Sequence, residues 1–510
     1  MLAHVNTLVI AGIEAQPVIV EVDIQNGLPH FEIVGLASTA IKEARERVRA
    51  AIKNSGFEFP NRKIIVNLSP ADMKKEGSHF DLAIAIGILL ASEQIISNAE
   101  KNLFITGELS LDGTVRKIPG ILPMALELAR INNADIRFIV PHDNSREAGL
   151  VNEVISYPIH NLTEMCNYLN GTLELFRVPA FNYNERTVLD ENYDFADVKG
   201  QESAKRALQI AAAGLHNILL IGPPGSGKTM LARRMPGIMP EMDREEILET
   251  TRIYSVANML NPQNPLISHR PFRAPHKNAS SASIIGGGRI PRPGEISLAQ
   301  NGILFLDELP EFSRDVLEAL RQPLEDKIVT VARAHSTYTF PANFSLVASM
   351  NPCFCGHFGS DKECSCTPLQ ITRYLNRVSG PLLDRMDIHV EVGRINYEQI
   401  TDQSQSESSA AIRERVKTAR AMQLKRFKNS KIKLNSQMRP QEVKKYCLID
   451  EKAEQLLKTA FNQFNMSARA YDRILKIART IADLEESSAI LLPHLAESLK
   501  YRTLDKKYWG

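Results

Sequence analysis

The stretch from His216 to Thr229 constrains the fold of this chain more than any other, because an apolar run leads straight into a complete phosphate-binding loop. The apolar run Ile218–Ile221 has the length and branching of a buried parallel strand, and the residues after Thr229 continue as a helix. Backbone N–H groups at such a strand-to-helix turn converge on phosphate oxygens. The loop consists of Gly222, Pro223, Pro224, Gly225, Ser226, Gly227, Lys228 and Thr229.

The residue types in this loop have separate chemical tasks. We expect Lys228 to reach the β- and γ-phosphates of ATP and the Thr229 hydroxyl to bind Mg²⁺. A Cβ atom at Gly225 or Gly227 would crowd the approach of phosphate to the backbone. A glycine-rich loop can arise by chance, but here every fixed position of the motif and the strand-loop-helix context agree. The sequence therefore predicts a site for ATP and Mg²⁺.

A second apolar run, followed by two acids, supplies the rest of a hydrolytic site. Four apolar residues follow Gly302 and form an expected buried strand that ends at Asp307 and Glu308. We expect Asp307 to join the magnesium shell and Glu308 to polarise the attacking water. An acidic turn after a strand is the plain alternative. Downstream of a full phosphate-binding loop, however, the pair indicates hydrolysis of the nucleotide and not only its binding.

Two further polar residues are candidates for the same site. Asn351 follows an expected strand and could hydrogen-bond the γ-phosphate or the water, although an Asn before Pro352 is also typical of a turn. Arg385 could reach the nucleotide of a neighbouring subunit with its rigid guanidinium group. The alternative for Arg385 is an ion pair within the chain, with Asp384 or Asp387.

Four of the six cysteines lie close together around a short polar loop. Tetrahedral zinc needs four soft ligands, and two Cys-x-Cys pairs supply them, although reduced thiols remain the alternative. The other two cysteines, Cys166 and Cys447, have the setting of isolated small apolar residues. The candidate zinc ligands are Cys353, Cys355, Cys364 and Cys366.

Two segments concentrate positive charge. In a long section rich in Pro, Gly, Arg and His, the glycines 286–288 precede Arg289 and Arg292 and could present a flexible cationic backbone to nucleic-acid phosphates. A structural insertion with incidental charge is the alternative. The segment 412–446 carries twelve Lys and Arg residues against two Glu, which indicates either an anionic partner or a solvated helix face.

The length of 510 residues and a content of 44% hydrophobic and 24% charged residues predict about three soluble domains. We expect an α/β domain over residues 1–178, a linker over 179–193, an ATPase core with a parallel sheet over 194–395, and an α-helical domain over 396–510. Within the last two domains we expect helices over 194–213 and 314–322 and an N-cap at Ser467, which would place Arg469 in the first turn of a helix. No stretch has the composition of a signal peptide or membrane span, so the sequence predicts a cytoplasmic protein without a membrane partner.

The first domain resembles the proteolytic domain of Lon proteases in two stretches, 75–85 and 106–122. On that pattern the nucleophilic serine position falls on His79, with Ser78 one place early, and the catalytic lysine position falls on Leu122. A serine nucleophile needs an adjacent base, and leucine cannot act as one. We therefore predict a domain without protease activity that serves assembly or partner binding.

The chain as a whole resembles an AAA+ ATPase of the magnesium-chelatase-like group, and more closely the ComM/YifB competence family. The resemblance rests on the nucleotide motifs above and on 273–276, 293–299, 320–325, 351–353 and 467–471. It implies that Asn351 is sensor 1, Arg385 the arginine finger and Arg469 sensor 2. It further implies a hexameric ring and a DNA branch-migration helicase that helps to integrate incoming single strands during natural transformation.

These expectations define one function and two alternatives. ATP hydrolysis between subunits would move pore loops along single-stranded and branched DNA, in company with recombination proteins. A motor of the magnesium-chelatase type and an ATP-driven protein remodeller or scaffold remain the alternatives. Stimulation of ATP hydrolysis by DNA would separate the first function from both.

Overall fold

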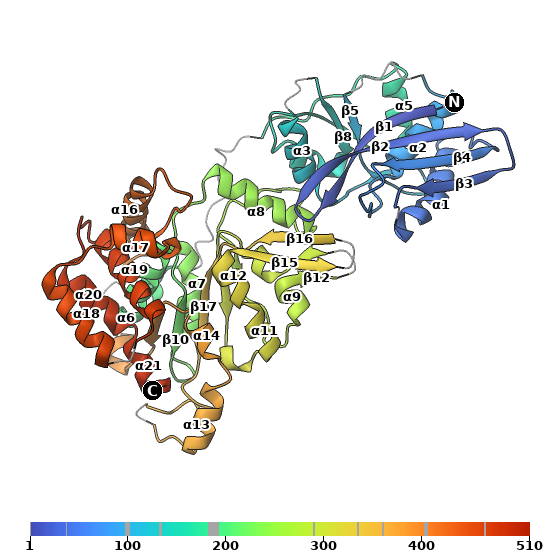
Figure 1. Ribbon diagram of the computed structural model, residues 1–510. Helices are drawn as coiled ribbons and strands as arrows, with labels where there is room; N and C mark the ends of the chain where they lie inside the picture. The colour runs from blue at the N-terminus through green and yellow to red at the C-terminus, as the bar shows by residue number, and fades with distance from the viewer. Residues whose placement is uncertain are drawn as a thin grey trace.

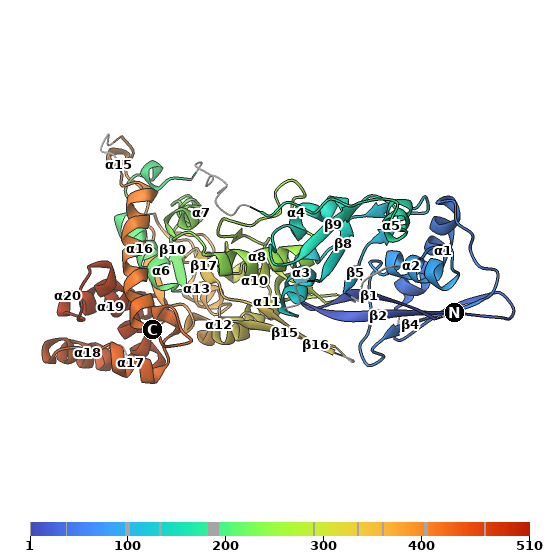
Figure 2. The same ribbon diagram turned by 90° about the horizontal axis from the view of Figure 1, so that it is seen from above.

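The computed structural model describes residues 2–36, 38–96, 102–131, 135–181, 193–288, 291–333, 336–359, 362–401, 406–463 and 466–509. The molecule is elongated: the Lon-like domain lies at one end, the C-terminal helices lie at the other, and the ATPase sheet lies between them (Figures 1 and 2). The predicted fold class, an α/β chain with a parallel ATPase sheet and a helical C-terminal region, is confirmed. No helix in the described ranges is long and apolar enough to cross a membrane.

The Lon-like domain is built on a seven-stranded sheet in the order β3-β4-β2-β1-β5-β8-β9. Helices α1 (Thr39–Asn54), α2 (Asp81–Ala91) and α5 (Leu162–Leu169) contribute to the core on one face, and α3 (Ile121–Arg130) and α4 (Ser145–Ala148) contribute to the core on the other. The strands are β1 (Leu2–Ala11), β2 (Glu14–Gln25), β3 (His30–Val34), β4 (Lys63–Ser69), β5 (Leu103–Ile105), β8 (Arg137–Pro141) and β9 (Ile155–Ile159); β6 (Glu108–Leu109) and β7 (Val115–Arg116) form a separate hairpin.

The ATPase sheet has five parallel strands in the order β11-β14-β17-β10-β18. Hydrophobic cores cover both of its faces, so every side chain of its three middle strands is buried. Parallel strands bring their carboxyl ends to one edge, and this edge carries the nucleotide motifs. The strands are β10 (Ile218–Ile221), β11 (Phe272–Arg273), β14 (Ile303–Leu306), β17 (Ser345–Met350) and β18 (Ile388–Glu391).

One predicted helix begins later than the sequence indicates. A helix over 194–213 is expected, but the chain forms a 3₁₀ turn at Phe195–Asp197 and then α6 (Glu202–Gly214). Gly200 and Gln201 both have positive φ angles, 59° and 60°, which interrupt a right-handed helix. At this interruption the Gln201 side-chain amide contacts the phosphate-binding loop. It donates to the backbone oxygens of Ser226 and Gly393 at 3.3 and 2.7 Å.

The section expected as a long flexible loop is largely folded. After α7 (Lys228–Ile238) and α8 (Arg244–Val256), it forms α9 (Ser281–Ile285), β12 (Gly286–Gly287), β13 (Arg292–Pro293) and α10 (Glu295–Leu298). Two arginines stabilise the start of this section. Buried Arg270 donates to the backbone oxygens of Pro240 and Asn301 at 2.5 and 2.7 Å. Arg273 makes a bidentate ion pair with Glu295.

The glycine run in this section is not a free backbone. Gly286 pairs with Pro293 and Gly287 with Arg292 in a short antiparallel ribbon. A Cβ atom at Gly286 would lie 2.4 Å from the Arg292 carbonyl oxygen, and its φ angle is 105°. The glycines therefore permit close strand pairing, which corrects the expectation of flexibility.

The helix expected over 314–322 is two helices, α11 (Arg314–Ala319) and α12 (Arg321–Asp326). Pro323 has no N–H group to donate to the carbonyl of Ala319, so a continuous helix would lack that bond. The hairpin of β15 (Ile328–Arg333) and β16 (Ser336–Pro341) follows, and α13 (Pro368–Leu375) and α14 (Gly380–Leu383) complete the ATPase domain.

The C-terminal helices form a lid domain with its own hydrophobic core. The predicted N-cap at Ser467 is confirmed, because its side chain accepts a hydrogen bond from the Ala470 N–H and places Arg469 in the first turn of α19. The lid helices are α15 (Tyr397–Thr401), α16 (Ser409–Arg426), α17 (Pro440–Tyr446), α18 (Glu451–Gln463), α19 (Ala468–Leu484), α20 (Leu492–Lys500) and α21 (Thr503–Trp509).

Three arginines of the basic segment 412–446 take part in internal packing. Arg413 donates to the Gly237 carbonyl and Arg420, which is buried, donates to the Ala212 carbonyl. Arg426 pairs with buried Asp483 on α19. These arginines attach α16 to the ATPase domain and to the lid. The exposed basic residues of the segment are Arg415, Lys425, Lys428, Lys431, Lys433, Arg439, Lys444 and Lys445.

The Lon-like domain is in contact with the ATPase domain. Helix α3 packs against α8, and the Ser255 hydroxyl donates to the Glu147 carboxylate at 2.5 Å. Ile13, from the turn between β1 and β2, joins the hydrophobic core on one face of the ATPase sheet.

Candidate active site

The phosphate-binding loop turns from β10 into α7 at the carboxyl edge of the ATPase sheet. Gly225 and Gly227 have φ angles of 75° and 88°, which glycine adopts without strain. A Cβ atom at Gly222 would lie 2.1 Å from the Val392 carbonyl oxygen, whereas a Cβ at Gly225 would meet no protein atom within 4 Å. Within the protein, the steric demand for glycine is therefore greatest at Gly222, while Gly225 and Gly227 are required by their conformation.

Lys228 folds back over this loop. Its ammonium group donates to the carbonyl oxygens of Gly222 and Pro223 at 2.8 and 2.9 Å and lies 3.2 Å from the side-chain oxygen of Asn351. Burial lowers the pKa of Lys228 to about 8, although the charges of Asp307 and Glu308 act to raise it. The lysine thus lies in the hollow of the loop, where the phosphates of a nucleotide would be bound.

The predicted magnesium ligands are already adjacent. The Thr229 hydroxyl donates to one carboxylate oxygen of Asp307 at 2.8 Å. The other oxygen accepts from the hydroxyl of Ser349 on β17 and from the Glu308 backbone N–H. A hydroxyl beside a carboxylate is the oxygen donor set that Mg²⁺ prefers, so these residues fit the ion. The sequence does not indicate Ser349, because only the strand pairing brings it beside Asp307.

Glu308 is held by a partner that the sequence motifs do not reveal. Its carboxylate lies 2.6 Å from the ammonium group of Lys277, which precedes it by 31 residues. The Glu308 side chain is 48% exposed, and its backbone has a positive φ of 54°, which directs the side chain away from the strand. In this arrangement the expected water-polarising carboxylate is engaged by a cation.

Asn351 and Arg385 lie in different settings. Asn351 follows β17, and its side-chain oxygen lies 3.2 Å from the Lys228 ammonium group. Arg385 makes an ion pair with Glu325 at 2.6 Å, and its side chain is only 11% exposed. The internal partner is therefore neither Asp384 nor Asp387, and nothing in the sequence near Arg385 singles out Glu325.

Arg469 lies exposed in the first turn of α19. Neither Arg385 nor Arg469 contacts the phosphate-binding loop through a hydrogen bond or ion pair recorded among the described residues. The structure therefore brings together Lys228, Thr229, Asp307 and Asn351, and it leaves the two arginines outside that group.

The four cysteines between β17 and α13 form a compact cluster. Their sulfur atoms all lie within 4.8 Å of one another, and Cys353 lies 3.3 Å from Cys355 and 3.7 Å from Cys364. These spacings are close to the roughly 3.8 Å between the corners of a tetrahedral site with Zn–S bonds of about 2.3 Å. The four thiols, of Cys353, Cys355, Cys364 and Cys366, therefore fit a tetrahedral metal ion.

The cysteine cluster touches the nucleotide loop. A Cβ atom at Gly356, inside the cluster, would lie 2.4 Å from a side-chain carbon of Pro224. The ring of Phe354 packs on Tyr374, which also hydrogen-bonds the backbone of Asn351. The cluster thus buttresses both the loop and the candidate sensor residue.

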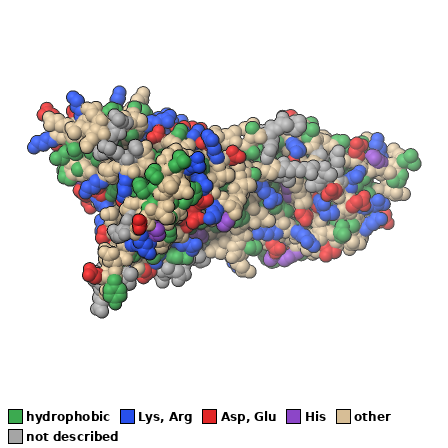
Figure 3. All heavy atoms as spheres, turned by 90° about the horizontal axis from the view of Figure 1, so that it is seen from below, with side chains coloured by type: hydrophobic (Ala, Val, Ile, Leu, Met, Phe, Trp, Pro, Cys, Tyr) green, Lys and Arg blue, Asp and Glu red, His purple; other side chains and the backbone are tan. Residues whose placement is uncertain are grey.

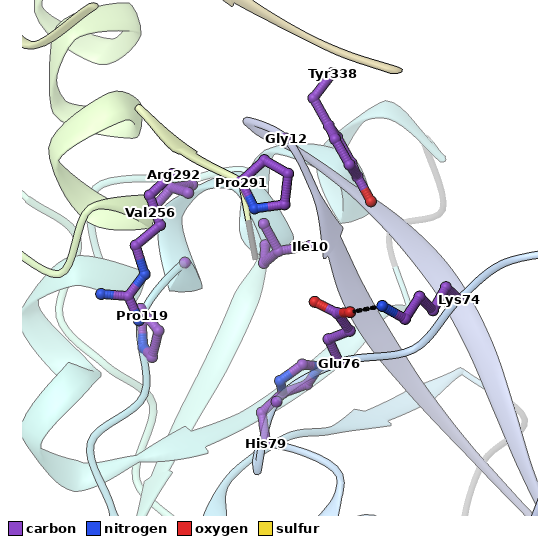
Figure 4. A pocket seen from close by; sticks show the side chains of 12 residues that line it. Ile10, Gly12, Lys74, Glu76, His79, Pro119, Val256, Pro291, Arg292 and Tyr338 are labelled. Carbon is purple, nitrogen blue, oxygen red and sulfur yellow. Dashed lines mark ion pairs between the residues drawn. The ribbon is translucent and has the colours of Figure 1, made fainter. Parts of the chain in front are cut away.

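His79, at the serine position of the Lon-like motif, lines a cavity of about 140 Å³ between the two domains (Figure 4). Leu122 is fully buried, and burial lowers the pKa of His79 to about 4. Ser78 hydrogen-bonds Glu108. Lys74 and Glu76 form an ion pair on one side of the cavity, and Arg292 and Tyr338 of the ATPase domain lie on others.

The candidate DNA contacts are only partly described. Arg289 lies outside the described residues, and Arg292 is exposed and lines the cavity in Figure 4. Figure 3 shows Lys and Arg side chains interspersed with Asp and Glu over the face seen from below. A single cationic patch is not visible on that face.

Comparison with known proteins covers nearly the whole chain. Residues 194–400 match a family model described as magnesium chelatase, subunit ChlI, and residues 20–144 and 406–502 match models of the same subunit and its C-terminal part. The chain is 45% identical to the uncharacterized protein YifB of Salmonella typhimurium, over 99% of this chain and 98% of that protein.

Two further relatives are similar to the whole chain and to a short part of it, respectively. The chain is 45% identical to the competence protein ComM of Haemophilus influenzae, over 97% of this chain and 96% of that protein. An archaeal Lon protease of Methanothermobacter thermautotrophicus is 42% identical over 72 residues, which are 14% of this chain and 10% of that protein.

Proposed function

Because the chain belongs to the magnesium-chelatase-like AAA+ family that includes ComM and YifB, we propose that it is an ATP-driven DNA motor of the branch-migration type. Membership of the family implies ATPase activity with ATP and Mg²⁺. The observation that carries the proposal is the meeting of Lys228, Thr229, Asp307 and Asn351 at one edge of the sheet, in a chain alike from end to end to a competence protein.

The residues of the site divide the work of hydrolysis. Bound Mg²⁺ would supply positive charge to the phosphates, and Thr229 and Asp307 would hold it. Lys228 would exchange its bonds to loop carbonyls for bonds to phosphate oxygens, with Asn351 orienting the end group. Glu308 would orient the attacking water once Lys277 leaves its carboxylate.

Coupling to DNA follows from the ring that the family resemblance implies. In a hexamer, Arg385 of one copy would act on the ATP of the next, with Arg469 assisting from the lid. Loops that include Arg292, and Arg289 beside it, would contact DNA phosphates, which single-stranded and branched substrates both offer. A role with recombination proteins in integrating incoming single strands during natural transformation is consistent with the name of the Haemophilus relative, competence protein ComM.

The test is an ATPase assay on the purified protein without DNA, with single-stranded DNA and with a labelled four-way junction, with strand separation followed in the same tubes. Lys228→Ala serves as the blank. We expect DNA to stimulate hydrolysis and the junction to dissociate. Hydrolysis that is indifferent to DNA would contradict the DNA motor and favour a protein client or a chelatase-type function, which the matching family models also allow.

We also propose that the cysteine cluster holds a structural zinc ion. Protein purified under reducing conditions should contain about one zinc per chain. Cys364→Ser should remove the metal and lower Tm by roughly 5–10 °C, as expected for the loss of a few kcal/mol from a domain of this size.

The matched control for this substitution is Ser365→Ala, which lies between two cysteines and removes no sulfur. It should keep both the zinc and the melting temperature. The proposal would be contradicted if the unaltered protein contained no zinc and had the same Tm as the Cys364→Ser variant. The four cysteines would then be reduced thiols without a metal.

A further inference from the structure

A buried polar cluster lies at the amino end of the ATPase sheet, opposite the edge that carries the nucleotide motifs. Its centre is Asp387, between α14 and β18, whose side chain is 13% exposed. One carboxylate oxygen accepts from the Asn217 N–H at 3.1 Å, and the other lies 3.3 Å from Nε of Arg473 on α19. Asp387 therefore touches both the start of the P-loop strand and the lid.

Asn217 extends this cluster to β17 and to the main chain of Arg385. Its side-chain oxygen accepts from the Leu346 N–H of β17 at 2.9 Å, and its side-chain nitrogen donates to the Arg385 carbonyl at 2.9 Å. Its backbone oxygen accepts from the Asp387 N–H at 2.9 Å. One amide thus joins the starts of β10 and β17, which end at the nucleotide site, to the main chain of Arg385.

Helix α19 is attached to the same cluster at two points. Arg473 contacts Asp387, and Thr480, about two turns further on, lies 2.8 Å from Nε2 of His216, the residue before Asn217. Arg469 lies one turn before Arg473 on the same helix. A shift of the lid relative to the sheet must either carry this cluster along or break it.

The charges around Asp387 make this position sensitive. Nε of Arg385 and Nη1 of Arg473 are buried and have no hydrogen-bond partner among the described residues. Burial lowers the pKa of Lys327 and of Lys476, and in both cases Asp387 opposes the shift. Removal of the Asp387 charge would therefore leave several half-buried cations facing one another.

We infer that Asp387 is a positioning residue that fixes Arg385 relative to the ATP-binding strand β10 and the lid helix α19. Buried hydrogen bonds hold these elements in one arrangement. A shift of β10 and β17 on ATP binding at one end would therefore move the Arg385 main chain, which is attached at their other end. This inference rests on the proposed function in one respect, since Arg385 is taken to act on the ATP of a neighbouring copy.

The inference is tested in mixed rings. Lys228→Ala subunits cannot use ATP but keep Arg385, whereas Arg385→Ala subunits bind ATP but lack that arginine. Mixing the two should restore hydrolysis at the interfaces where an intact arginine meets an intact ATP site. When the arginine-donating subunit also carries Asp387→Asn, we expect about 10- to 100-fold less restored activity, as for a misplaced catalytic group.

Asp472→Asn on the donating subunit is the matched control. Asp472 is the neighbour of Arg473 on α19, but it lines the groove against α18 and not the cluster around Asp387. It should leave the restored activity unchanged. Binding of a fluorescent ATP analogue by the Asp387→Asn protein should also match wild type, which a general loss of structure would not permit.

The outcomes separate the two proposals. Failure of the plain mixture to regain activity would overturn the trans role of Arg385 and leave Asp387 without the task assigned to it. Full restoration by donors carrying Asp387→Asn, or equal loss with Asp472→Asn, would overturn the inference alone. If Asp387→Asn does not assemble, Arg473→Gln breaks the same contact from α19 and should give the same loss.

Discussion

Arg385→Ala is expected to lower ATP hydrolysis by about 10³- to 10⁵-fold, while ATP binding stays close to that of the unaltered protein. A guanidinium group that stabilises charge on the transferring phosphoryl group acts in the transition state and contributes little to binding. In the single chain Arg385 is held by Glu325 and does not touch the chain's own phosphate-binding loop. Steady-state hydrolysis and equilibrium binding of a fluorescent ATP analogue measure the two effects separately.

Glu325→Gln provides the control for that substitution. It removes the internal carboxylate partner of Arg385 but keeps the arginine, and Glu325 is half exposed, so the fold should tolerate the change. We expect hydrolysis within a few-fold of the unaltered protein. Retained turnover in Arg385→Ala would reject the arginine as a catalytic group and leave its pair with Glu325 as its only role.

Glu308→Gln is expected to lower hydrolysis by about 10²- to 10⁴-fold without weakening ATP binding, since an amide cannot accept a proton from water. The substitution keeps the shape of the side chain, and Asp307 keeps its bonds to Thr229 and Ser349. Single-turnover hydrolysis of bound ATP is the appropriate measurement, because it excludes effects on nucleotide exchange.

Glu311→Gln is the matched control for Glu308→Gln. Glu311 lies one 3₁₀ turn further on, where it pairs with Arg377 at 2.9 Å on the surface. Its loss should change hydrolysis little. If Glu308→Gln and Glu311→Gln behave alike, another group orients the water and the assignment of Glu308 is wrong.

The sequence predicts the parts of this protein whose geometry is local. A phosphate-binding loop, a buried strand and an N-cap such as Ser467 are each determined by a few adjacent residues. The fold class follows from the order of the expected strands and helices in the same way.

Pairings across the chain could not be read in this way. Lys277 meets Glu308, and Glu325 meets Arg385, only because packing of the whole domain brings their segments together. The predictions for the start of α6 and for the glycine run were wrong for a related reason. The left-handed backbone at Gln201 and the close approach of strands at Gly286 depend on tertiary contacts.

The ion pair of Lys277 and Glu308 bears on ATP hydrolysis by molecules that are not bound to their target. An ammonium group 2.6 Å from the carboxylate engages the side chain that we expect to hold the attacking water. A subunit in this state would retain a bound triphosphate for a long time before breaking it down. A cell that kept such a protein ready between rare encounters with its target would lose little of its ATP to it.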